Sequence, residues 1–174
     1  MERAGVSTSA LFYYSGKRKR RNIEMSFTDD KKRGKVGERV VKGYFEAIGA
    51  EIRDLSEDSE YQAQDVDLIA ADGLTYEVKT DYRFAETGNL ALEDSVTNYY
   101  GTHKSWLWTS KADYFCFVDP NQTNRFVAIS AEDLRHLVEF ESFRKVSKDD
   151  GYKYISLYLL PYWKYQECFN VYEY

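Results

Sequence analysis

The stretch "DVDLIAADGLTYEVKTD", residues 65–81, decides the fold. It contains two short apolar segments separated by "ADG", a pattern that predicts a β-hairpin. It also carries charged side chains on or beside the two strands: Asp65, Asp67, Glu77, Lys79 and Asp81. Because desolvating a charge is costly, charged side chains stay off a buried sheet unless they are paired or hold a metal ion. The hairpin is therefore the first place to look for a functional site.

The length of the turn decides which of these charges meet. A two-residue turn would place Asp67 and Glu77 on opposite faces of the hairpin. A three-residue loop over residues 71–73 would instead set Asp67 opposite Glu77 and Asp65 opposite Lys79. That loop ends on a glycine, as in a type I turn followed by a residue in the left-handed conformation. A slip of one residue would move every side chain to the other face, so the turn determines the site, and we predict the three-residue loop.

In this register the carboxylates of Asp67 and Glu77 lie side by side, with Cβ atoms about 4.5–5.5 Å apart. Two carboxylates that close repel each other unless a cation lies between them. Mg²⁺ takes one or two carboxylates together with waters and substrate phosphate, and the carbonyl of Val78 would complete the protein's share. Lys79 would then orient an attacking water, lower its pKa or neutralise charge in the transition state.

A helix is predicted over residues 34–48, because apolar residues recur there at helical spacing. Gly49 follows as a typical residue just beyond a helix C-terminus. The apolar stripe centres near Gly37, which predicts close packing of the helix against a sheet. Glu38 lies at the edge of this stripe and can therefore lean toward the surface on which the helix packs.

The rest of the chain contains more strands than helices. We expect strands at 66–70 and 74–79, a turn or loop at 81–88, a strand at 89–96 and a loop-rich stretch with a short helical segment at 97–111. A central strand at 112–119 and a strand at 125–130 follow, and then a helix over 130–145 with Ser130 as N-cap and a strand at 152–162 ended by Pro161. This order predicts an α/β or α+β fold with a mixed central sheet flanked by helices.

Length and composition indicate how many domains the chain forms and where in the cell it is expected. The 174 residues, 43% of them hydrophobic, suit one domain, which we place at residues 26–174 after a flexible basic leader at 1–25. A vector-derived extension, a misassigned start and a nucleic-acid-binding arm remain alternatives for that leader. No apolar run predicts a membrane span and no secretion signal is recognisable, so we expect a cytoplasmic protein. Cys116 and Cys168 are expected to be small core residues.

The net charge of −5 argues weakly against a protein coated with nucleic acid over its whole surface. The charge is uneven, however, with basic runs at 16–21 and 31–35 and an acidic run at 51–60. Such a chain is compatible with a local basic path beside an acidic metal pocket. The 16 tyrosines predict mixed core and surface packing, and tyrosine rings can also stack on bases.

The residues of the hairpin and the preceding helix resemble a known family. "DLIAADGLTYEVK" is similar to the Asp…Glu-x-Lys signature of the PD-(D/E)XK nuclease superfamily, whose core is restriction-endonuclease-like. "GKVGERVVKGYFEAIGAEI" resembles the helix that precedes this signature in archaeal Holliday junction resolvases and in small phage-type and restriction nucleases. The proline that usually comes before the family's aspartate is Val66 here.

The resemblance implies a role for each matched residue. The metal-binding acid falls on Asp67, the motif carboxylate on Glu77, the lysine on Lys79 and the helix acid on Glu38. The implied activity is a Mg²⁺- or Mn²⁺-dependent endodeoxyribonuclease that leaves a 5′-phosphate, acting on DNA that includes structured or branched forms. A homodimer is plausible, because one such site cuts one strand. A phage or prokaryotic origin would fit this family.

Several alternatives stay open. The same fold would also serve a catalytically inactive DNA- or protein-binding module, such as a phage-encoded inhibitor, and RNA remains possible as a partner. Asp65 competes with Asp67 for the metal, and both Asp65 and Asp81 are either partners of Lys79 or solvated acids at strand ends. Glu93 and His103 are weaker candidates for the site. Neither a phosphate-binding glycine loop nor a nucleophile elbow is present.

Overall fold

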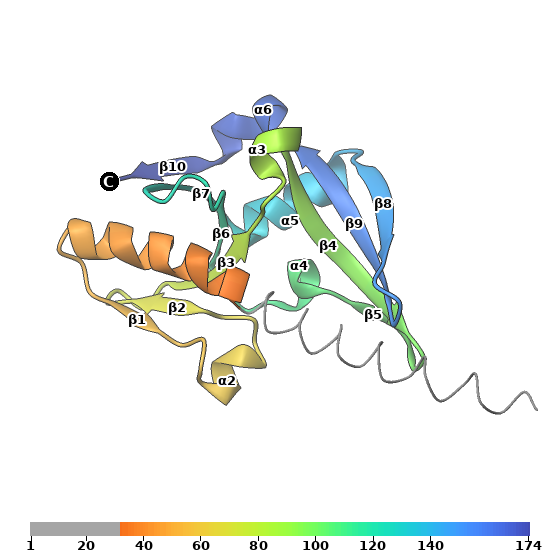
Figure 1. The fold of residues 1–174 in the computed structure, drawn as a ribbon, viewed down its shortest axis with the longest axis horizontal. Helices are drawn as coiled ribbons and strands as arrows, with labels where there is room; N and C mark the ends of the chain where they lie inside the picture. The colour runs from red at the N-terminus through yellow and green to blue at the C-terminus, as the bar shows by residue number, and fades with distance from the viewer. Residues whose placement is uncertain (1–31) are drawn as a thin grey trace, which may run out of the picture. The chain divides into compact units, whose positions relative to one another are not determined.

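Two β-sheets form the framework of the described chain, which in this computed structural model comprises residues 32–174 (Figure 1). The six-stranded sheet has the order β1 (Ile52–Asp54), β2 (Leu68–Ala70), β3 (Thr75–Thr80), β6 (Tyr114–Val118), β7 (Arg125–Ser130) and β10 (Asn170–Glu173). The four-stranded sheet has the order β5 (Gly101–Lys104), β4 (Asn89–Asn98), β9 (Tyr154–Pro161) and β8 (Arg144–Asp149). The expected leader at 1–25 and its basic run lie outside the described residues.

Helices are fewer and mostly short. Residues 32–47 are helical, and we refer to them as the 32–47 helix, which is orange in Figure 1. The others are α2 (Ser59–Gln62), α3 (Phe84–Thr87), α4 (Trp106–Thr109), α5 (Ala131–Phe140), α6 (Tyr162–Tyr165) and the 3₁₀ turn η1 (Gln166–Cys168). None of the helices in the described part of the chain has the length and apolarity needed to cross a membrane. The prediction of a mixed α+β fold with a mixed central sheet is confirmed.

One parallel strand pair organises the molecule. β3 lies parallel to β6, while every other neighbouring pair in the six-stranded sheet is antiparallel. Parallel neighbours require a long crossover connection, and here residues 81–113 provide it. That connection contains β4, β5 and α4, so the second sheet begins inside the crossover that joins the two central strands of the first.

Side chains of β6 alternate between two cores. Phe115 and Phe117 belong to the larger core, which also contains residues of α4, α5, β4 and β9. Cys116 and Val118 belong to the core under the 32–47 helix, together with Val40. A strand that is apolar on both faces is expected at the centre of a covered sheet, so "YFCFV" takes the central place that its sequence predicts.

Close packing of the 32–47 helix depends on Gly37. A Cβ atom there would clash with Thr80 Oγ1 and lie 3.1 Å from Val78 Cγ1. The helix backbone therefore rests directly on β3, as the apolar stripe predicts. At its end, Gly49 has a φ of 73°, a left-handed conformation that favours glycine, and its N–H donates to Glu46 O. The predicted helix and its terminating glycine are both confirmed.

Several details differ from the expectations. The stretch at 81–88 holds the short helix α3 in place of a simple loop, and 97–111 holds a hairpin as well as α4. The helix after Ser130 ends at Phe140, and residues 144–149 form β8, whose exposed polar side chains hide the strand in the sequence. Cys168 is exposed, whereas Cys116 is fully buried as expected. β10 was not anticipated.

Replacing Gly37 with alanine tests the close approach. We expect Gly37→Ala to lower the free energy of unfolding by about 1–3 kcal/mol, the usual cost of overpacking. Adding Thr80→Ala to this variant should restore part of the lost stability. Gly43→Ala is the matched control, since its Cβ would meet only the ring end of the C-terminal Tyr174. Urea unfolding measures both, and an equal loss at Gly37 and Gly43 would contradict the assignment.

Candidate functional site

The hairpin adopts the predicted register. Leu68 lies opposite Tyr76 and Ile69 opposite Thr75, so the ladder places residue 67 opposite residue 77. The turn is closed by bonds from the Ala70 N–H to Leu74 O and from the Gly73 N–H to Ala70 O, both at 2.9 Å. Gly73 has a φ of 90°. The three-residue loop is therefore confirmed, and Asp67 and Glu77 lie on the same side of the hairpin.

Asp67 lies immediately before β2 and is held by the backbone of β3. One carboxylate oxygen, Oδ2, accepts a hydrogen bond from the Val78 N–H at 2.8 Å. The Asp67 N–H donates to Tyr76 O at 2.9 Å, and Asp67 O accepts from the Leu55 N–H at 2.7 Å. The two backbone bonds fix the main chain of Asp67, and the bond from the Val78 N–H holds its carboxylate beside Glu77.

Asp65 does not pair with Lys79 across the hairpin, and that expectation was wrong. β2 begins only at Leu68, and Asp65 has a φ of 51°, a left-handed conformation that turns the chain before the strand starts. Its carbonyl accepts from Ser110 Oγ at 2.8 Å, and its carboxylate from Thr109 Oγ1 at 3.2 Å. Asp65 therefore ties the hairpin to the end of α4 while its charge still acts on Glu77 and Lys79.

Glu77 and Lys79 point to the face of the sheet opposite the 32–47 helix. In the parallel register Glu77 lies beside Phe115 and Lys79 beside Phe117, both members of the larger core. Glu77 is only 5% exposed. The Lys79 ammonium contacts Glu77 Oε1, and Nζ lies 4.6 Å from the centroid of the Trp106 ring. A carboxylate and an ammonium therefore share a half-closed site with an aromatic wall.

The acids of the site resist ionisation. Burial raises the pKa of Glu77 to about 7, and the neighbouring Asp67 charge adds to the rise against the opposing effect of Lys79. Burial likewise raises the pKa of Asp67, opposed by the Val78 N–H and by Lys79 and assisted by the charge of Glu38. Burial acts to lower the pKa of Lys79, but Glu77 and the two aspartates outweigh it and the pKa is raised.

Asp67, Glu77 and Lys79 influence one another, and Glu38 acts on Asp67. Glu38 reaches the site from the 32–47 helix, since its charge acts on Asp67. Val78 supplies its N–H to Asp67, and a role for its carbonyl stays a prediction. Sequence reasoning missed Trp106, the wall beneath Lys79. Trp106 is visible in the sequence only as one aromatic residue of the loop-rich stretch, and nothing there indicates which strand it covers.

The donor set suits a hard divalent cation that keeps most of its waters. Within residues 32–174 no three His, Cys, Asp or Glu side chains gather as a ready-made metal cage. Asp67 and Glu77 nevertheless offer two adjacent carboxylates, whose pKa values are raised chiefly by burial. Mg²⁺ is commonly held by one or two carboxylates plus waters and substrate phosphate, so the residues present fit that ion.

A pocket of about 240 Å³ opens beside Lys79 between the two sheets. Its lining includes Asp81, Glu93, Trp106 and Lys148. Asp81 accepts the Arg83 N–H at 2.8 Å and so begins the turn into α3, whereas Glu93 accepts from Ser105 Oγ at 3.0 Å. His103 lies on β5, exposed, and His136 is exposed on α5 beside Phe140. Neither histidine is among the residues that line this pocket.

Comparisons with known proteins add little to this geometry. No protein-family model matches the sequence, and no curated protein matches it. Among solved structures, a bacterial homing endonuclease, I-Ssp6803I, is similar at 17% identity and a TM-score of 0.47, over 71% of this chain and 87% of that one. A likeness of this extent defines neither fold nor activity, so the functional conclusion depends on the side chains described above.

The raised pKa of Glu77 has a consequence for stability. Because burial raises the pKa of Glu77 to about 7, the folded protein keeps a proton there up to about pH 7, whereas the unfolded chain loses it near the ordinary glutamate pKa of 4.5. Without divalent ions, folding stability should therefore fall as the pH rises through this window. We expect Glu77→Gln to flatten that fall by on the order of 1–3 kcal/mol.

Thermal unfolding in EDTA across this pH range measures the effect. Glu86→Gln, which removes an exposed acid on α3, is the matched control and should leave the slope unchanged. Parallel pH curves for the wild type and Glu77→Gln would show that Glu77 ionises normally in the folded protein.

Proposed function

We propose that this protein is a metal-dependent endodeoxyribonuclease that hydrolyses phosphodiester bonds to leave a 5′-phosphate. The observation that supports it best is the junction of Asp67, Glu77 and Lys79 on adjoining strands of one hairpin, where Glu77 is buried and ionises with difficulty. Burying two carboxylates side by side costs stability. Such an arrangement is expected where the acids have a chemical task.

Asp67 and Glu77 would hold Mg²⁺ or Mn²⁺, with the Val78 carbonyl as a third protein ligand. Glu38 would support a second ion or its water. When bound, a divalent cation supplies Lewis acidity, neutralising phosphate charge and easing the deprotonation of water. The protein's part is to fix the two carboxylates, which the three backbone bonds of Asp67 and the register of the hairpin accomplish.

Lys79 would act as a cation and hydrogen-bond donor. Its raised pKa keeps the ammonium protonated at neutral pH, so it is unsuited to the role of general base. Glu77 and the Trp106 ring hold the ammonium beside the pocket. From there it would orient the attacking water and stabilise the negative charge that develops on the phosphate in the transition state.

One such site cuts one strand, so cleavage of both strands would require a homodimer or two successive encounters. A cytoplasmic enzyme of phage or prokaryotic origin is the setting that the family resemblance implies. These points belong to the proposal and depend on the same carboxylate pair.

A second function remains a candidate because Lys79 contacts Glu77 directly. A buried acid that already has a cationic partner needs no metal, and the fold would then serve as an inactive DNA- or protein-binding module. The two functions differ in what Asp67 does. A metal ligand leaves the fold intact when it is neutralised, whereas a structural partner of Lys79 does not.

Thermal unfolding with Mg²⁺ separates these functions. We expect Mg²⁺ to raise the melting temperature of the wild type. At a hundredfold excess of Mg²⁺ over its Kd, the free energy of unfolding should increase by about 2.7 kcal/mol. Asp67→Asn should abolish the rise and leave the metal-free melting temperature unchanged or higher, while Glu86→Gln should behave as the wild type. If Asp67→Asn only destabilises the protein, the acids are structural.

Cleavage assays test the activity itself. Supercoiled plasmid and single-stranded DNA would be incubated with Mg²⁺, Mn²⁺ or EDTA. We expect metal-dependent cutting that falls at least about 100-fold in Glu77→Ala and Lys79→Ala and persists in Glu86→Gln. The ratio of nicked to linear plasmid reports whether one strand or both are cut. Absence of cutting with either metal on either DNA would favour the binding module.

A further inference from the structure

The four-stranded sheet turns one face toward the candidate site. Alternation along β8 puts Arg144 and Lys148 on the same face, opposite Leu159 and Ile155 of β9 respectively. Lys148 and Ile155 line the pocket that contains Lys79. We call this side of the sheet the pocket face. It continues from the pocket along β8, so a chain bound beside Lys79 would lie against it.

Within the described part of the chain, the basic side chains that β8 places on the pocket face form no ion pair. Arg144 and Lys148 are both exposed and take part in none of the ion pairs found within residues 32–174. On the opposite face, Lys145 pairs with Asp94 at 2.7 Å and lies over the Tyr158 ring. The sheet therefore neutralises its lysine on one face and leaves two cations available on the other.

Exposed tyrosines occupy the far end of the same sheet. Tyr99 and Tyr100 form the two-residue tip between Asn98 and Gly101 and are 94% and 86% exposed. The Asn98 side chain accepts the Tyr100 N–H at 2.9 Å, which shapes the tip. Leaving two large aromatic rings in solvent at a tight turn gains nothing for folding, so these rings are suited to an external partner.

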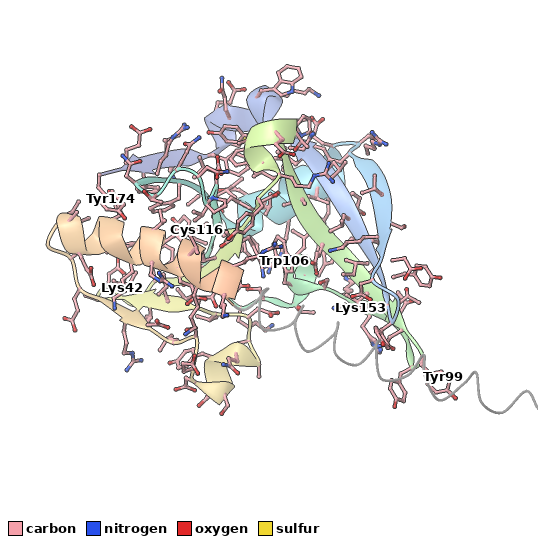
Figure 2. All side chains as sticks on the ribbon, in the orientation of Figure 1. Lys42, Tyr99, Trp106, Cys116, Lys153 and Tyr174 are labelled. Carbon is pink, nitrogen blue, oxygen red and sulfur yellow. The ribbon has the colours of Figure 1, made fainter. Side chains whose placement is uncertain are left out.

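The adjoining turn of the sheet presents similar chemistry. Thr97 of β4 pairs with Tyr154 of β9, so the tip and the β8–β9 turn lie at one end, where Figure 2 labels Tyr99 and Lys153. Tyr152 and Tyr154 are each 58% exposed. The two acids nearby, Asp149 and Asp150, accept N–H groups of their own turn. Because Lys153 Nζ lies 3.9 Å from Asp150 Oδ2, exposed aromatic rings dominate what this end offers.

We propose that the four-stranded sheet is a nucleic-acid-binding arm, in which Lys148 and Arg144 contact backbone phosphates and Tyr99 and Tyr100 stack on unpaired bases. The preferred ligand is accordingly DNA with unpaired bases beside a duplex. Cations that track phosphates and aromatic rings that accept bases are the combination used to bind single strands. The choice of DNA rests on the proposed nuclease function.

The length of the arm fits this ligand. Glu93 lines the pocket and Asn98 begins the tip, and both lie on β4. A strand rises about 3.3 Å per residue, so the separation is roughly 17 Å, the length of about five nucleotides along one strand. Phosphates beside the pocket and splayed bases at the tip would thus belong to one short stretch of DNA.

Binding in EDTA tests the arm without cutting. Fluorescence anisotropy would compare the full-length wild type on a blunt duplex and on the same duplex with a single-stranded tail. We expect the wild type to prefer the tailed DNA, and Tyr99→Ala/Tyr100→Ala to reduce that preference about tenfold. Lys148→Ala and Arg144→Ala should each weaken binding of the two DNAs equally. Each should also reduce the slope of log affinity against log salt concentration by about one.

Lys145→Ala is the matched control for charge, since it removes a cation from the same strand on the opposite face. Trp163→Ala, which removes an exposed ring from α6, is the control for aromatic loss. The arm is refuted if the wild type binds neither DNA, or if the tyrosine and lysine variants bind as the controls do. If the protein cuts DNA but the arm variants bind normally, the nuclease function is supported and the arm is refuted. If the arm variants lose binding but the protein never cuts DNA, the arm is supported and the nuclease function is refuted.

Discussion

The hydrogen bond from the Val78 N–H to the Asp67 carboxylate is the contact on which the rest of the site depends. β2 has not yet begun at Asp67, so the side chain completes the hydrogen bonding of β3 where a neighbouring backbone would otherwise do so. The same bond sets the carboxylate next to Glu77. A register shifted by one residue would turn Glu77 and Lys79 toward the 32–47 helix, where Gly37 leaves no room for them.

Because side chains alternate along β3, one face of the central sheet packs against the 32–47 helix and the other carries the charged residues of the site. On the helix side, Val78 and Cys116 are buried under Val40 and Val41. On the other side, Glu77 and Lys79 take the positions that Phe115 and Phe117 occupy one strand further along. Two charged residues thus stand in a row of apolar ones, at the edge of the larger core. The cost of desolvating these two charges is limited because Trp106, from the crossover, covers the Lys79 ammonium without enclosing it.

Local signals made the central elements predictable. The glycine of the turn gave the register, the apolar stripe around Gly37 gave the helix contact, and Ser130 gave the start of α5, whose N-cap bond from the Asp133 N–H is 3.0 Å long. The second sheet was not predictable in the same way. "RKVSKD" is polar on both faces, and becomes a strand only because β9 offers it a partner. Trp106 and the pocket likewise arise from the crossover, and no local pattern encodes that path.

The charge balance of the site connects its chemistry with its substrate. Burial is the main cause of the raised pKa values of Asp67 and Glu77. The charge of Glu38 adds to the rise at Asp67 and the charge of Asp67 adds to the rise at Glu77, while Lys79 opposes both. A phosphodiester brought to the same place adds further negative charge and would be repelled. If Asp67 and Glu77 hold a divalent cation, as proposed, its charge would offset both sources of repulsion, and Lys79 would be able to face the phosphate. Ion and DNA should therefore bind cooperatively, each lowering the electrostatic cost of the other. The cations of the pocket face lie outside this balance, so they would attract DNA before any ion is bound, and the carboxylates would decide only whether it can be cut.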